Sequence, residues 1–220
     1  MNQVNEFVMH ASFFPHRALM RDTEMLNRIA GRIDSLSKLQ LSQLSKWYAF
    51  YWNMMEEHHQ AEDDIMFVEI EKRLNAPSES IEHMETEHNR LQFLIDEIKR
   101  LIGEAVRENG SLLKIKEQLS ACTKELLQLF TSHIGKEEKY VVEKMTANFT
   151  PAEQRAIENR VKRKAPLKYL SYMIPWLHES LSAEENQQFD TSLPRVVKLL
   201  NHFFWKGKYE RMVTPLRSMI

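Results

Sequence analysis

The sequence has few of the residues that cross-link or interrupt a chain. Its 220 residues include one cysteine, Cys122, with five glycines and seven prolines. A single thiol forms no internal disulfide, and it excludes cysteine-ligated iron–sulfur clusters and cysteine-rich zinc modules. The scarcity of glycine and proline favours long helices over turns and strands.

An excess of charge and long apolar runs are also missing. Thirty basic side chains stand against thirty-one acidic ones, so the net charge is −1. This balance gives no reason to expect a nucleic acid or an anionic membrane as a partner. The N-terminal stretch lacks the basic start and apolar run of a secretory signal, and no segment approaches the roughly 20 apolar residues of a membrane span. With the lone thiol, these features predict a cytoplasmic protein.

Amphipathic segments fill the first two thirds of the chain. Apolar residues recur with helical spacing over residues 13–35, 41–74, 79–108 and 112–147. The predicted turns between and after them are Ser35–Lys38, Asn75–Ser80, Asn109–Ser111 and Asn148–Pro151. Helices joined by such short connections run antiparallel and bury a shared core. The sequence therefore predicts an all-α protein with an up-down four-helix bundle over residues 10–148.

Residues 150–220 have a different pattern and are predicted to form a helical extension packed on the bundle. Pro151 follows Thr150 as the first residue of a helix, and Ser182 with Glu185 has the spacing of a capping box. Aromatic residues are frequent in this region. We expect them to form a packing surface, or an interface with a second copy or another protein.

Six polar residues fall on the apolar stripes of the bundle helices. They are His16, His58, Glu62, His88, His133 and Glu137. Two helices repeat the same His-x-x-x-Glu unit, in which both side chains lie on one face one turn apart. Burying such groups without partners costs several kcal/mol. Hydrogen-bonded core histidines would explain any one of them, but the whole set favours a common ligand.

The spacing between these residues tests whether they meet. In an antiparallel helical hairpin, two residues equidistant from the turn lie at the same height. The pairs His16 with His58, His88 with His133, and Glu62 with His88 each have their midpoint inside a predicted turn. An error of one helical turn would displace a residue by about 5 Å along the axis. The three turns therefore predict that all four histidines lie in one layer.

Imidazole and carboxylate ligands suit iron or manganese, with zinc as a further candidate. Six protein ligands exceed what one metal ion with an open position takes. We therefore expect two metal ions bridged by Glu62 and Glu137, each with two histidines.

The motifs that carry these residues resemble those of the hemerythrin HHE cation-binding family. They are Phe14-Pro-His16-Arg-Ala-Leu, His58-His-Gln-Ala-Glu62-Asp, Glu87-His88-Asn-Arg-Leu and His133-Ile-Gly-Lys-Glu137-Glu. The resemblance covers roughly residues 10 to 147. It implies a non-haem di-iron centre that binds O2 or reacts with O2, peroxide or NO, with the six residues above as ligands.

Three further residues are candidates for the metal or its surroundings. The O2-carrying members of the family have another histidine four residues before the position of His88, where this chain has Met84. Glu138 is included because it lies five residues after His133, which is the spacing between histidine and last carboxylate in the O2-carrying members. His59 follows His58 and is expected to point about 100° away from it. Asp63 and Asp64 are expected to be solvated charges.

Two functions follow from these observations. The missing histidine favours a sensor of iron or oxygen, or a stress-response or detoxifying protein, over simple O2 transport. The alternative is an interaction module that metal stabilises and that binds a partner without turnover. A ferritin-like oxidase is disfavoured, because that class uses Glu-x-x-His pairs. No catalytic residue is assigned.

Overall fold

Helices account for nearly all of the computed structural model, which describes residues 5–107, 110–164 and 167–220. No strand occurs within these ranges, and the prediction of an all-α protein is confirmed. Four long helical segments come first: α1 (Phe14–Ala30); α2 (Lys38–Ala61) continued through a π-helical turn (Glu62–Phe67) into α3 (Val68–Leu74); α4 (Glu79–Arg107); and α5 (Leu112–Asn148). In the described part of the chain, no helix is both long enough and apolar enough to cross a bilayer.

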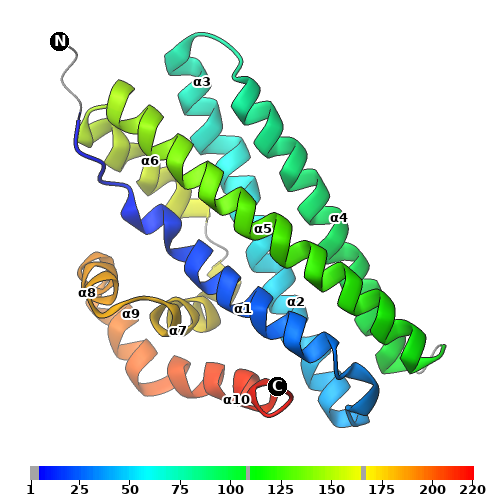
Figure 1. Cartoon of the computed structure of the whole chain (residues 1–220). Coiled ribbons are helices and arrows are strands. Elements are labelled where there is room, and N and C mark those ends of the chain that lie inside the picture. The colour runs from blue at the N-terminus through cyan, green and yellow to red at the C-terminus, as the bar shows by residue number, and fades with distance from the viewer. Residues whose placement is uncertain (1–4, 108–109, 165–166) are drawn as a thin grey trace.

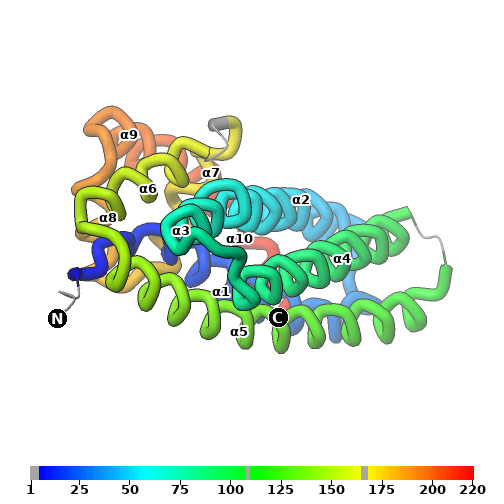
Figure 2. The backbone as a smooth tube through the Cα atoms, turned by 90° about the horizontal axis from the view of Figure 1, so that it is seen from above, coloured from blue at the N-terminus to red at the C-terminus, as the bar shows by residue number. Residues whose placement is uncertain are grey.

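The four long segments lie side by side (Figures 1 and 2). Helix α5 packs against α4 and α1, and α2 packs against α4 and α1. Leucine, isoleucine and aromatic side chains from all of them fill the space between, among them the fully buried Leu19, Trp47, Ile95 and Phe130. Burial of this apolar surface is the main source of stability for the arrangement.

The helix ends lie where the local chemistry predicts them. Ser37 and Gln40 form a capping box at the start of α2, and Asn75 ends α3 in the left-handed conformation with φ 53°. Pro151 is the first residue of α6 (Pro151–Lys164). These ends agree with three of the predicted turns. The predicted boundary at Glu108 and Asn109 lies outside the described residues.

The π-helical turn, called the π-turn below, changes the inward face of the second segment. Regular helical spacing puts Val68 on the buried stripe, yet Val68 is half-buried and Ile70 is fully buried. A π-helical turn accommodates one residue more than an α-helical turn, so the stripe moves by one position beyond it.

The C-terminal extension lies against the outside of the long helices. Its helices are α6, α7 (Leu170–Ser180), α8 (Ala183–Ser192), α9 (Arg195–Leu200) and α10 (Lys206–Arg217), with a second π-helical turn (Asn201–Trp205) before α10. Helix α6 packs against the first π-turn, α7 against α1, and α10 against α7 and α2 (Figure 1).

Buried hydrogen bonds tie the extension to the rest of the chain. The indole nitrogen of Trp176 on α7 donates to Asp22 on α1 at 2.8 Å, and both residues are buried. Gln154 on α6 accepts from the Val8 backbone nitrogen at 3.0 Å and donates to backbone carbonyls of the N-terminal segment and of α5. Apolar residues of α7, α8 and α10 belong to the same core cluster as those of α1 and α2.

Candidate metal centre

A layer of buried histidines and carboxylates lies between the four long segments, where α2 passes into the π-turn. It contains His16 from α1, His58 and His59 from α2, Glu62 from the π-turn, His88 from α4, and His133 and Glu137 from α5. No member is more than 9% exposed. The structure thus brings together the six predicted ligands and adds His59.

One half of the layer is formed by α1 and α2. The Nε2 atoms of His16 and His58 lie 3.5 and 3.1 Å from the same oxygen of Glu62, Oε1. Glu137 Oε2 is 3.7 Å from His16 Nε2. Potential ligand atoms of His16, His58 and Glu62 all lie within 4.8 Å of one another, which is close enough for one ion to contact all three.

The other half is formed by α4, α5 and the end of α2. The Nε2 atoms of His88 and His133 are 3.0 Å apart, and Glu137 Oε2 is 3.2 Å from His133 Nε2. Glu62 Oε2 lies 3.9 Å from His88 Nε2. Potential ligand atoms of His59, His88 and His133 form a second group within 4.8 Å, and those of Glu62, His88 and Glu137 form a third. The two carboxylates therefore face both halves.

His59 points into the layer because α2 has two neighbours. His58 faces α1, where its ring centroid lies 4.7 Å from that of His16. His59 faces α4, where its ring stacks on His88 with centroids 4.2 Å apart and planes 12° apart. The inward arc of a bundle helix is wide enough to hold two consecutive residues when each contacts a different neighbour. The two adjacent histidines of the sequence motif are the signal for this arrangement.

Carboxylates hold the outer nitrogens of two ligand-type histidines on α4 and α5. Asp63 lies 2.8 Å from His88 Nδ1, and Glu87 lies 3.0 Å from His133 Nδ1. Lys136 donates to the other oxygen of Glu87 at 2.6 Å. Such pairs fix the tautomer and direction of a metal-ligating ring. The prediction that Asp63 is a solvated charge was wrong, and Glu87 was missed although it directly precedes His88.

Glu138 makes the same contact with α1. Its Oε1 lies 3.0 Å from His16 Nδ1 and accepts from Arg17 at 3.0 Å. The structure therefore places Glu138 on the outer side of His16. Met84 is buried beside the layer, in the apolar cluster that contains Ile65 and Met66.

The buried groups shift one another's protonation. Burial opposes a charge on His16, but Glu137, Glu138 and Glu62 outweigh it and raise the pKa of His16 to about 10. Burial and the neighbouring rings lower the pKa values of His58 and His59 well below the usual range. Neutral imidazoles offer the lone pairs that a metal ion requires.

The two carboxylates shift in opposite directions. Burial and the proximity of Glu137 raise the pKa of Glu62 well above its usual range. For Glu137, burial is outweighed by His16 and His133, so its pKa is lowered. Two carboxylates that face the same small volume do not both ionise without a compensating positive charge, and a cation supplies that charge.

Several of the inward atoms have no hydrogen-bond partner among the described residues. They are Nε2 of His16, His58 and His59, Oε2 of Glu62, and both oxygens of Glu137. An unsatisfied buried polar atom costs about 1–3 kcal/mol, and more where it is charged. Metal coordination satisfies all of them at once, so the residues present fit a metal centre.

Comparison with protein families decides the assignment. The model for the hemerythrin HHE cation-binding domain matches residues 14–145, which include every residue of the layer. The chain belongs to the hemerythrin HHE cation-binding family. The resemblance inferred from the motifs is confirmed, and with it the expectation of a cation-binding domain.

Curated relatives of this HHE protein come from Arabidopsis thaliana. Zinc finger protein BRUTUS is 28% identical over 209 residues, covering 93% of this chain and 16% of the relative. Two BRUTUS-like zinc finger proteins are each 24% identical, covering 83% and 82% of this chain and 14% of each relative. The chain thus spans about one sixth of these proteins or less. No solved structure matches it.

Proposed function

We propose that the four long segments form a hemerythrin-type up-down bundle that holds a di-iron centre. The carrying observation is that ligand-type atoms of the layer form two histidine groups joined by two carboxylates, and that several of these atoms have no hydrogen-bond partner among the described residues. We further propose that this centre binds or reacts with O2, peroxide or NO, as a sensor or in protection against stress. The cytoplasm as the location, and the absence of nucleic-acid and membrane partners, stay predictions.

The donor set assigns residues to each ion. His16 and His58 would hold the first iron, and His59, His88 and His133 would hold the second. Glu62 and Glu137 would contact both, because each faces both halves of the layer. Five imidazoles and two carboxylates suit iron better than softer metals, with manganese and zinc as the alternatives. When bound, the iron pair supplies the redox chemistry that no side chain here provides.

The chain's own residues prepare this site. Asp63, Glu87 and Glu138 orient His88, His133 and His16 through their outer nitrogens. Burial of the layer excludes bulk water and strengthens every charge interaction inside it.

Reactivity of the ferrous protein tests the functional part of the proposal. Mixing anaerobic ferrous protein with O2, peroxide or NO is expected to change its visible absorption in proportion to the centres present. His88→Ala should abolish the change. His83→Ala should retain it, because His83 is exposed on the same helix and outside the layer. A ferrous centre inert to all three reagents would contradict the proposal.

A metal-stabilised interaction module is the second candidate, favoured by one surface. Val196, Leu199, Phe203 and Phe204 on α9 and the second π-helical turn are each 58–67% exposed. Exposed apolar side chains that lie close together mark interaction sites. If metal controls this surface, hydrogen exchange of residues 195–206 should slow when metal binds. Equal exchange with and without metal would contradict a metal-controlled module.

A further inference from the structure

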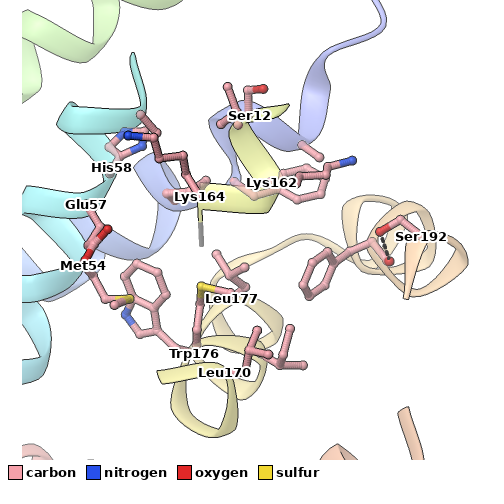
Figure 3. Close-up of a pocket in the computed structure, with 18 of the residues that line it drawn as sticks. Ser12, Met54, Glu57, His58, Lys162, Lys164, Leu170, Trp176, Leu177 and Ser192 are labelled. Atoms are coloured by element: carbon pink, nitrogen blue, oxygen red, sulfur yellow. Dashed lines mark hydrogen bonds between the residues drawn. The ribbon is translucent and has the colours of Figure 1, made fainter. Parts of the chain in front are cut away.

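An apolar cavity of about 310 Å³ lies between the long helices and the C-terminal extension (Figure 3). One wall comes from the start of α1 and from α2, and includes Met54, Ala61 and the metal-layer residue His58. The opposite wall comes from α6, α7 and α8, and includes Trp176 and Leu177. The cavity therefore exists only because the extension packs where it does, and it places the extension beside the metal layer.

The lining defines the chemistry of an occupant. Most of the exposed lining is apolar, from Phe14, Met173, Ile174, Phe189 and the residues named above. Pockets of about 300 Å³ or more with mostly apolar walls are typical small-molecule sites. An apolar cavity of about 150 Å³ holds benzene, so a cavity twice that size has room for a bicyclic molecule.

The charged side chains in the wall do not favour an anion. Lys162 donates to Glu158 at 2.8 Å, and Lys164 donates to Asp64 at 2.7 Å, so both ammonium groups already have a carboxylate. Glu57 adds a carboxylate to the wall (Figure 3). An uncharged molecule avoids both the repulsion from Glu57 and the loss of hydration that a charged ligand would suffer.

One hydroxyl group of the wall is open to a hydrogen bond. Ser192 Oγ donates to the Phe189 carbonyl at 2.7 Å, whereas Ser12 Oγ has no hydrogen-bond partner among the described residues. In His16, His88 and His133 the outer ring nitrogen has a carboxylate partner. His58 contacts the Glu62 carboxylate through Nε2, on the metal side.

We propose that this cavity is a binding site for a compact, uncharged, mostly apolar organic molecule, and that its occupancy is coupled to the metal centre through His58. Binding itself is independent of the proposed iron. The coupling rests on the proposed function, because His58 is both a wall of the cavity and a candidate ligand. An occupant packs against the His58 ring and restricts the positions that the ring takes at the metal.

Binding is tested with 5-fluoroindole as the probe, followed by fluorine NMR on the full chain. We expect saturable binding, and weaker binding of indole-3-acetate in competition. Ala61→Phe on α2 and Met173→Trp on α7 should each weaken binding about tenfold or more by filling the cavity from opposite walls. Ala147→Phe, at an exposed position of α5, should leave affinity unchanged. No saturable binding, tighter binding of the acetate, or wild-type affinity in both cavity variants would overturn the site.

The second measurement separates the site from its coupling. Visible circular dichroism of the iron-loaded protein is recorded with and without saturating 5-fluoroindole. We expect a spectral change in the wild type that Met173→Trp, on the wall opposite His58, abolishes. Saturable binding without any spectral change would overturn the coupling and leave the site. A protein that takes up no iron but binds the probe would contradict the proposed function and not the cavity.

Discussion

At the scale of single residues, His16, His88 and His133 each direct Nε2 toward the layer while a carboxylate holds the outer ring nitrogen. Asp63 and Glu87 are the clearest examples, because both contact the outer nitrogen of a ring whose Nε2 faces the centre. Neither position was predicted as functional from sequence. A carboxylate next to a ligand in sequence resembles any surface charge, and only the approach of a neighbouring helix shows which ring it contacts.

Glu87→Gln and Asp63→Asn should therefore weaken metal binding without removing a ligand. Loss of such a partner typically lowers metal affinity about 10- to 100-fold. Competition against a chelator of known affinity gives the change. Glu82→Gln on the exposed face of α4 is the matched control and should bind as the wild type does. Unchanged affinity in both variants would show that these carboxylates do not position the rings.

At the scale of helices, the π-turn sets the register between the metal layer and the apolar residues beyond it. His58 and His59 precede it and Ile70 follows it, and all three are buried. Helical periodicity predicted the four long segments, although α1 ends at Ala30 and not at the predicted Ser35. It could not predict the extra residue of the π-turn, since neither glycine nor proline marks it.

Deleting Asp64 from the π-turn tests this register. The deletion restores α-helical spacing and rotates the histidines about 100° relative to α3. We expect metal binding to be lost and thermal stability to fall. Asp64→Ala removes the same exposed ion pair with Lys164 at constant chain length, and should keep the metal. If the deletion variant binds metal normally, the π-turn does not set the geometry.

The hydrogen bond that attaches α7 to α1 provides a second test at the scale of helices. Trp176→Phe removes the buried hydrogen bond to Asp22 and is expected to lower the free energy of unfolding by about 1–3 kcal/mol. Trp52→Phe removes a hydrogen bond of the same kind, to Asp96 at the surface, and should cost about 0.5 kcal/mol. Urea denaturation of both variants measures the difference. Equal costs would show that the buried bond does not anchor the extension.

At the scale of the whole molecule, the chain joins a metal layer, an apolar core and an extension that meet at α1 and α2. The layer could be predicted from the sequence, because the distance of a residue from the turn of an antiparallel hairpin fixes its height along the helices. The packing of α6 to α10 could not be predicted from the sequence. Aromatic residues such as Trp176 and Tyr209 indicate that a side chain is buried, but they do not indicate which helix it packs against. The cavity beside His58 results from that packing, and no sequence motif indicates it.

Metal should stabilise the whole fold, since its ligands come from all four long segments. A ligand at 100 times its dissociation constant adds about 2.7 kcal/mol to the free energy of unfolding. For a chain of this size that corresponds to about 5–10 °C in Tm. Scanning calorimetry before and after chelation measures the shift. An equal Tm would mean that no metal binds the native layer tightly.

Metal content is the most direct test of the di-iron centre. Iron, manganese and zinc per chain are measured by mass spectrometry on anaerobically purified protein, with a Mössbauer spectrum of the iron-57 form. We predict two irons per chain in magnetically coupled sites, falling to one or none in Glu62→Ala. A single metal ion, two zinc ions, or none would contradict the assignment of this layer as a di-iron centre.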